Sequence, residues 1–152
     1  EWTPAGPSSY ELLYRSGAGL TPRPLRRIAS GGELSRVMLA SKVVLGNADG
    51  VDTLVFDEVD AGVGGSTARA LAGVLADLAA THQVIVVTHL AQVAVMADKH
   101  YVVGKEPGDV PQTHLDEVTG DARTAEIARM LSGDQSEASL AHAKQMLAEA
   151  RA

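Results

Sequence analysis

Two short apolar runs, separated by one helical pattern, constrain the fold of this chain most strongly. Residues 51–56 form an apolar run that ends in acids, and residues 84–87 form a second run rich in β-branched side chains. Between them, residues 66–80 carry apolar side chains at helical spacing. Strand, helix and strand at these lengths predict a βαβ unit with both strands buried in a parallel sheet. The predicted fold class is therefore α/β, with a mostly parallel sheet flanked by helices.

A second strong helical pattern covers residues 33–45, and Ser30 with Glu33 forms a capping box at its start. The first 25 residues are rich in proline, glycine and serine and predict an irregular arm with an edge strand at 10–14. The other expected elements are helices over 91–97, 121–131 and 136–150, and strands over 101–103 and 113–118.

Length and composition limit the class of protein. The 152 residues suffice for one domain, and 45% hydrophobic with 21% charged residues is typical of a globular chain. The absence of cysteine excludes a disulfide framework and suits a reducing cytoplasm. No apolar run is long enough to span a membrane. The chain begins at Glu1 rather than methionine, so we expect a piece of a longer protein.

Charge is unevenly distributed along the chain. The first 45 residues carry six basic and three acidic side chains, and the remainder carries 7 basic and 16 acidic ones. Such asymmetry is compatible with a DNA-binding surface, but it fits a solvated surface beside an acidic metal-binding half better. Composition alone therefore does not predict DNA binding.

The first candidate site is the start of the helix predicted from residue 33, where Ser30, Gly31, Gly32 and Glu33 follow one another. Adjacent glycines let a backbone approach a ligand closely, and a helix N-terminus carries roughly half a positive charge that stabilises an anion. The Ser30 hydroxyl can add a donor to a phosphate oxygen. A capping box that merely starts a helix is the alternative interpretation.

The second candidate site is the pair Asp57 and Glu58, which directly follows the first predicted strand. Open α/β folds bind ligands at this carboxyl edge of the sheet. Asp57 is suited to hold Mg²⁺ through water, since magnesium prefers oxygen ligands and keeps much of its hydration shell. Glu58 is then placed to orient or deprotonate an attacking water. Paired acids after a strand also arise by chance, so this pair alone does not establish a site.

The third candidate is His89, which follows the second predicted strand and so reaches the same edge. It could contact a phosphate or position a water, although lone histidines are more often structural.

The order and spacing of these three motifs resemble the ABC ATPase family. In that family the Ser-Gly-Gly helix start is the signature motif, the strand ending in Asp-Glu is Walker B, and the later histidine is the switch histidine. Residues 60–63 resemble the D-loop. Glu33 stands where transporters usually have glutamine, whereas the chromosome-maintenance and repair branch often has glutamate.

Longer strings resemble a DNA-repair member of that branch, at residues 28–36, 56–63, 87–94 and 126–133. Ala29 replaces the leucine that usually opens an ABC signature, and Gly62-Val63 replaces the usual D-loop leucine-aspartate. Both departures weaken a transporter interpretation more than they weaken ATPase chemistry. The resemblance implies that residues 26–152 are the C-terminal lobe of an SMC-like P-loop ATPase head, preceded by the arm at 1–25.

The resemblance also implies roles for the candidate residues. Asp57 would serve Mg²⁺, Glu58 would activate water, and His89 would sense the γ-phosphate of ATP. The residues implied in nucleotide binding are Ser30, Gly31, Gly32, Glu33 and Asp60. The signature residues among them would reach the ATP of a second head, giving an ATP-dependent homodimer. The implied setting is DNA double-strand break repair and recombination in the bacterial cytoplasm, near the nucleoid, with no membrane.

One part of an ATPase is missing from the sequence. No G-x-x-x-x-G-K-[ST] loop occurs, and the glycines at 17–19 are not followed by lysine. That loop cradles the phosphates of the nucleotide. The resemblance places it on an N-terminal Walker A lobe of the same protein, beyond a long coiled coil. We therefore expect the 152-residue chain alone to be inactive.

Other classes of function stay open at this point. A self-contained metal hydrolase could use Asp57, Glu58, Asp60 and His89, but it leaves the Ser30 motif unexplained. A non-catalytic dimerisation or DNA-binding module would leave Glu58 unexplained. The head lobe of another ABC ATPase, either chromosome-structuring or transporter, is the remaining alternative.

Overall fold

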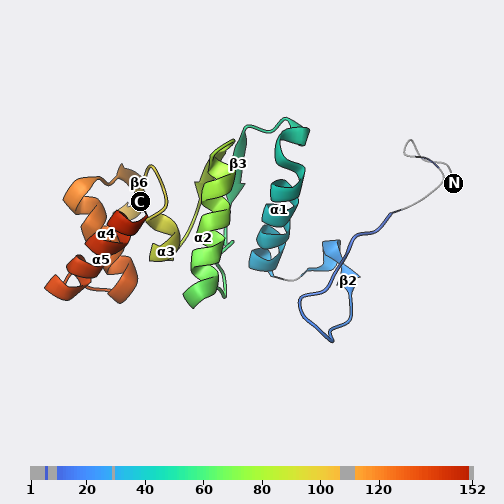
Figure 1. Cartoon of the computed structure of the whole chain (residues 1–152), viewed down its shortest axis with the longest axis horizontal. Coiled ribbons are helices and arrows are strands. Elements are labelled where there is room, and N and C mark those ends of the chain that lie inside the picture. The colour runs from blue at the N-terminus through green and yellow to red at the C-terminus, as the bar shows by residue number, and fades with distance from the viewer. Residues whose placement is uncertain (1–5, 7–9, 29, 107–111, 151–152) are drawn as a thin grey trace.

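The computed structural model describes residues 6, 10–28, 30–106 and 112–150, and it has the expected α/β class (Figure 1). The described strands form three two-stranded sheets, of which one is parallel and two are antiparallel. The parallel part is therefore smaller than the mostly parallel sheet that the sequence led us to expect. The strands are β1 (Leu13–Tyr14), β2 (Arg23–Pro24), β3 (Thr53–Phe56), β4 (Gln83–Val86), β5 (Tyr101–Glu106) and β6 (Gln112–Glu117).

The predicted βαβ unit is confirmed by β3, α2 (Gly65–Ala79) and β4. The two strands are parallel, with Leu54 opposite Val84 and Phe56 opposite Val86. The apolar stripe of α2 is buried at Ala68, Leu71, Ala72, Leu75 and Leu78, whereas Ala79, which helical spacing places on the same face, is exposed. Residues of α2 and the inward residues of β3 form the main core together with Leu39, Val59 and Val93. Its members are Leu39, Leu54, Phe56, Val59, Leu71, Ala72, Leu75, Leu78 and Val93.

The expectation that both strands are buried is wrong for one face of the sheet. Leu54 and Phe56 are buried, whereas Val55 between them is 65% exposed. On β4, Ile85 is 47% exposed, and Val87 just after the strand is 59% exposed. Side chains alternate across a strand, and the described helices bury only the face that carries Leu54 and Phe56. Parallel sheets normally have both faces covered, so this sheet presents an uncovered apolar face.

Helix α1 (Gly31–Leu45) precedes β3 and packs lightly. Its buried residues are Gly32 and Leu39, and Leu39 joins the main core. Much of its remaining apolar surface faces outward, including Val44, which is 85% exposed. Two short 3-10 turns flank this region, η1 (Leu25–Arg27) before the helix and η2 (Gly46–Asp49) after it.

The C-terminal part has its own core, built from three helices: α3 (Ala91–Ala94), α4 (Gly120–Ser132) and α5 (Glu137–Glu149). Ile127 and Ala143 are fully buried at the centre of this second core. The buried Arg123 guanidinium donates to the carbonyl oxygens of Ala94, Val95 and Ala97 at 3.1, 3.3 and 2.6 Å. Arg123 thereby ties α4 to the carbonyl end of α3.

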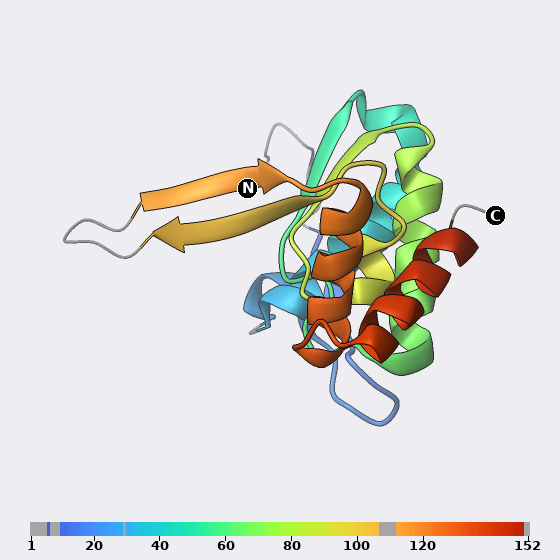
Figure 2. The ribbon, with the colours of Figure 1, turned by 90° about the vertical axis from the view of Figure 1, so that its left-hand side faces the viewer.

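Strands β5 and β6 form a hairpin that projects from the rest of the molecule (Figure 2). They pair from Tyr101 opposite Glu117 to Glu106 opposite Gln112, so both strands are confirmed and β5 is longer than expected. His114 packs over Gly104, where a Cβ atom would collide with its ring. Residues 107–111, which lie between the two strands in sequence, are outside the described residues. In the described part of the chain, every helix is too short or too polar to cross a membrane.

Candidate functional site

The carboxyl ends of β3 and β4 lie side by side and deliver the candidate residues to one edge. Phe56 ends β3, and the Val87 N–H donates to its carbonyl oxygen at 2.9 Å. Asp57 and Glu58 therefore leave the sheet next to the segment that carries Thr88 and His89. The sequence prediction that the acid pair and the histidine share one sheet edge is confirmed by this pairing.

Glu58 has an unusual backbone conformation. Its φ is 56°, and it is the one non-glycine residue with positive φ among those that the structure describes. Such a conformation costs on the order of 1–3 kcal/mol and is often found at functional sites. It turns the chain sharply after Asp57 and brings the Glu58 carboxylate to the first turn of α1. A Cβ atom built on Gly31 would collide with the Glu58 Oε2 atom.

The Ser30–Glu33 motif begins α1 as predicted. Ser30 is the N-cap, and its hydroxyl oxygen accepts from the Glu33 N–H at 3.4 Å. Gly32 is packed tightly, since an added Cβ would lie 2.7 Å from the Ala61 Cβ and 2.8 Å from the Glu58 carbonyl oxygen. The two glycines thus let the positive end of a 15-residue helix approach the loop that follows β3. Ala29, the departure from the usual signature, lies outside the described residues.

Alanine substitution at the two glycines should have different effects on stability. Gly32→Ala should lower the free energy of unfolding by about 1–3 kcal/mol, because the colliding Glu58 carbonyl oxygen belongs to the backbone. Gly31→Ala should change it by less than about 1 kcal/mol, because the colliding atom ends a flexible side chain and alanine favours a helix. Its effect should instead fall on any reaction that needs the Glu58 carboxylate in place.

The midpoints of thermal unfolding of the two variants, measured on the same length of chain, distinguish these two expected effects. Equal midpoints for Gly31→Ala and Gly32→Ala would contradict the close backbone packing at Gly32.

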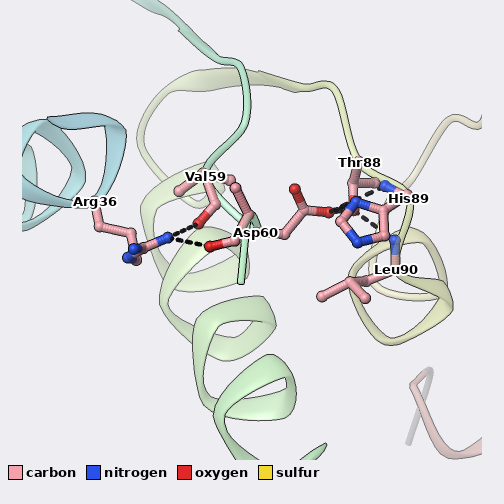
Figure 3. A network of polar contacts seen from close by, with 7 residues as sticks. Arg36, Val59, Asp60, Thr88, His89 and Leu90 are labelled. Atoms are coloured by element: carbon pink, nitrogen blue, oxygen red, sulfur yellow. Dashed lines mark hydrogen bonds and ion pairs between the residues drawn. The ribbon is translucent and has the colours of Figure 1, made fainter. Parts of the chain in front are cut away.

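The loop after Glu58 is fixed from both sides (Figure 3). The Arg36 Nη1 atom of α1 donates to the carbonyl oxygens of Val59 and Ala61 at 3.2 and 2.9 Å. Between them, Asp60 is 1% exposed, and its Oδ2 atom faces the segment after β4. The Thr88 hydroxyl donates to that oxygen at 2.5 Å, and the His89 N–H donates to it at 3.0 Å. The His89 Nδ1 atom lies 3.2 Å from the same oxygen.

A cleft of about 320 Å³ runs between α1 and β3 and reaches Asp57. Its walls are mostly apolar: Gly31, Leu34, Ser35, Met38, Lys42, Leu54, Val55, Phe56 and Asp57. Asp57 itself is exposed at the end of this cleft. A single exposed carboxylate fits Mg²⁺, which is commonly held by one or two carboxylates together with substrate phosphates.

A self-contained metal site is not assembled. In the part of the chain that the structure describes, three or more histidine or acidic side chains never gather closely enough to hold a metal ion. Asp57, Glu58, Asp60 and His89 share one region, but Asp60 is turned toward Thr88 and Glu58 toward Gly31. This arrangement disfavours the metal hydrolase alternative.

Two residues that complete the geometry were missed by the motif analysis. Arg36 lies three residues after Glu33 on α1, and Thr88 immediately precedes the predicted histidine. Thr88 also accepts from the Leu90 N–H at 3.0 Å, so it organises the turn that presents His89. Its place at the end of a predicted strand was an available signal. The pairing of Arg36 with the loop after β3 depends on tertiary packing, so no signal in the sequence could have predicted it.

Comparison with known proteins identifies the relatives of this chain. No family model matches it. The chain is 51% identical over 146 residues to the DNA repair protein RecN of Treponema pallidum, and 54% identical over 144 residues to that of Deinococcus radiodurans. These matches cover 95% and 94% of the chain. Over almost all of its length, the chain is therefore similar to RecN proteins. The Streptomyces coelicolor RecN is a further relative, at 48% identity over 98% of the chain.

The chain spans about a quarter of the length of these RecN proteins, at 26%, 25% and 26%. A solved structure described as "Structural biochemistry of ATP-driven dimerization and DNA stimulated activation of SMC ATPases" aligns with a TM-score of 0.46 and 20% identity. The alignment covers 89% of this chain and 69% of the chain in that structure.

Proposed function

We propose that this chain is the hydrolytic half of an SMC-like ATPase head, which acts on DNA in double-strand break repair and recombination. The observation that carries the proposal is the meeting of three motifs at one sheet edge. Asp57 and Glu58 end β3, the signature-like turn of α1 packs against Glu58, and His89 is tied to the following loop. RecN relatives, named DNA repair proteins, support the biological setting.

The acids have separate roles in this proposal. Asp57 would hold Mg²⁺ at the open end of the cleft, where the ion would neutralise charge on the phosphates of ATP. Glu58 acts as the general base for the attacking water. Its strained backbone, with φ of 56°, supports this role, since the carboxylate lies beside Gly31 at the start of α1. His89 contacts the γ-phosphate or its water.

The signature-like turn binds nucleotide from a second head. Ser30, Gly31, Gly32 and Glu33 present the positive end of α1, and Ser30 and Gly31 are exposed. Its own Glu58 already occupies the inner side of the turn, which leaves the outer side for the γ-phosphate bound to a partner. ATP would then hold two heads together, and hydrolysis would release them.

The phosphate-binding lobe comes from another part of the same protein. Three observations support a large missing contact. The β3–β4 sheet has an uncovered apolar face, α1 exposes Val44, and the RecN relatives are about four times as long. We propose that the Walker A lobe covers this surface and that residues 26–152 form one lobe with the arm at 1–25. We place the complete protein in the bacterial cytoplasm, near the nucleoid.

Exchange of Asp57 for asparagine in the complete protein tests the metal role. Asp57→Asn should weaken nucleotide binding in the presence of Mg²⁺, because the amide is neutral and a poorer magnesium ligand. Binding measured in excess chelator should change little. Equilibrium titration with a fluorescent ATP analogue, with and without Mg²⁺, reads both quantities. Equal affinities of wild type and variant with Mg²⁺ present would refute the assignment of Asp57.

A further inference from the structure

Asp60 is a buried acid that the proposed chemistry does not use directly. Its exposed fraction is 1%, and the adjoining Val59 is fully buried. A buried carboxylate is costly unless it accepts hydrogen bonds. Asp60 meets this requirement inside the chain, through the Thr88 hydroxyl and the His89 N–H. It is therefore oriented inward, toward the segment that carries the switch-like histidine.

The same carboxylate oxygen also faces the His89 ring. The Oδ2 atom lies 3.2 Å from Nδ1, while 69% of the His89 side chain is exposed to solvent. A carboxylate oxygen presents lone pairs to the ring, so the contact is attractive when Nδ1 carries a proton and repulsive when it does not. A partner at one ring nitrogen fixes the role of the other. The ring atom left to meet a ligand is therefore Nε2.

The backbone on either side of Asp60 is held in place independently. Arg36 donates to the carbonyl oxygens of both neighbours, Val59 and Ala61. The loop therefore cannot shift along α1 without breaking charge-assisted hydrogen bonds. A continuous polar chain results, from the signature-like helix through the loop to His89 (Figure 3).

We propose that Asp60 is the positioning residue for His89: it holds the ring with Nδ1–H toward the loop and Nε2 toward the nucleotide. This inference rests on the proposed ATPase function and assigns Asp60 a different part in it from direct nucleotide contact. Burial supports this assignment, because a carboxylate 1% exposed and engaged by Thr88 and His89 is not accessible to a nucleotide on a second head. Through Arg36, the position of the ring also depends on the placement of α1.

The ring itself provides a test that does not need activity. The complete protein is labelled with ¹⁵N-histidine, and the two ring nitrogens of His89 are identified by the signals lost in His89→Gln.

Wild type should show a protonated Nδ1. Asp60→Ala should lose this signature, and Asp60→Asn should restore part of it because an amide oxygen can occupy the Oδ2 position. Asp121→Ala is the matched control, because it removes an exposed acid in the first turn of α4 and should leave the ring signature unchanged. Asp60→Ser, whose hydroxyl is too short to reach the ring, replaces Asp60→Ala if that variant does not fold.

ATP turnover then shows whether the ring position matters. Asp60→Ala should lower kcat on the order of 10–100-fold with little change in KM, as is common when an orienting partner is lost. In the His89→Gln background the same substitution should cause no further loss, because the two residues act as one unit. Independent, multiplying losses would overturn the proposal, and so would an unchanged ring signature in Asp60→Ala. If wild type and Glu58→Gln turn over ATP equally, the ATPase proposal fails, and the ring signature still decides the role of Asp60.

Discussion

Glu58→Gln in the complete protein should lower ATP turnover by about 10²–10⁴-fold, as expected when a general base is removed. Glutamine keeps the size and hydrogen bonding of the side chain but cannot accept a proton. Nucleotide binding should survive, because Asp57 and the phosphate-binding lobe are untouched. Head dimers should accumulate in ATP, because their release depends on hydrolysis. Steady-state phosphate release and the fraction of dimer by light scattering measure both effects.

A matched control is available on α5. Glu137→Gln makes the same chemical change at an exposed acid in the first turn of that helix, remote from the sheet edge. It should leave turnover at the wild-type value. A loss of nucleotide binding in Glu58→Gln as large as that in Asp57→Asn would show that the two acids form one metal site rather than two separate roles.

Ser30→Arg should strongly weaken ATP-dependent dimerisation while leaving ATP binding to a single head nearly intact. The arginine side chain would fill the outer side of the α1 N-terminus, where we propose that the partner's γ-phosphate enters. We expect the dimer dissociation constant to rise at least about tenfold, equivalent to about 1.4 kcal/mol. Sedimentation in ATP, paired with nucleotide titration of monomeric heads, measures the two properties separately.

In Ser30→Arg, the effect of losing the helix cap must be distinguished from the effect of losing the proposed contact with the partner's nucleotide. Ser30 caps α1, and replacing such a cap typically costs about 1 kcal/mol. Ser136 caps α5 in the same way, by accepting from the Ser139 N–H, and it lies at the exposed start of that helix. Ser136→Arg should therefore show a similar loss of stability with normal dimerisation. Collapse of ATP binding to monomeric Ser30→Arg heads would make Ser30 a folding residue or a ligand of its own head's nucleotide.

Local sequence signals predicted most elements because their causes are local. The cap at Ser30 starts α1 where expected, and Gly133, with φ of 75°, ends α4 between the two helices expected over 121–131 and 136–150. The apolar stripe of α2 is buried at the spacing that defined it. Side-chain periodicity and glycine conformations depend on neighbours in the chain, so one sequence suffices to find them.

Burial of the strands was predicted less well, because burial depends on what covers them. Val55, Ile85 and Val87 are apolar in sequence, yet each is exposed in the structure. The apolar pattern of the two strands indicates that these positions suit a covered sheet. It does not show that the covering segment lies within this chain. This mismatch is the physical reason for placing a second lobe on that face.

The contacts between the motifs could not be predicted from the sequence. The three motifs and their order indicated a common site, but neither the approach of Gly31 to Glu58 nor the tie between Asp60 and His89 follows from spacing. Both arise where α1, the loop after β3 and the end of β4 pack together. Arg36 illustrates the limit, because its partners are the backbone carbonyls of Val59 and Ala61, which carry no side-chain signal.

Complementation of two separate polypeptides tests the central claim most directly. ATP turnover is measured for residues 1–152 alone, for the N-terminal phosphate-binding lobe alone, and for their mixture. The proposal predicts no significant turnover by either piece and turnover by the mixture that disappears with Glu58→Gln in this chain. Steady turnover by residues 1–152 alone, proportional to their concentration and abolished by Glu58→Gln, would contradict it, because the chain would then hold a complete catalytic site.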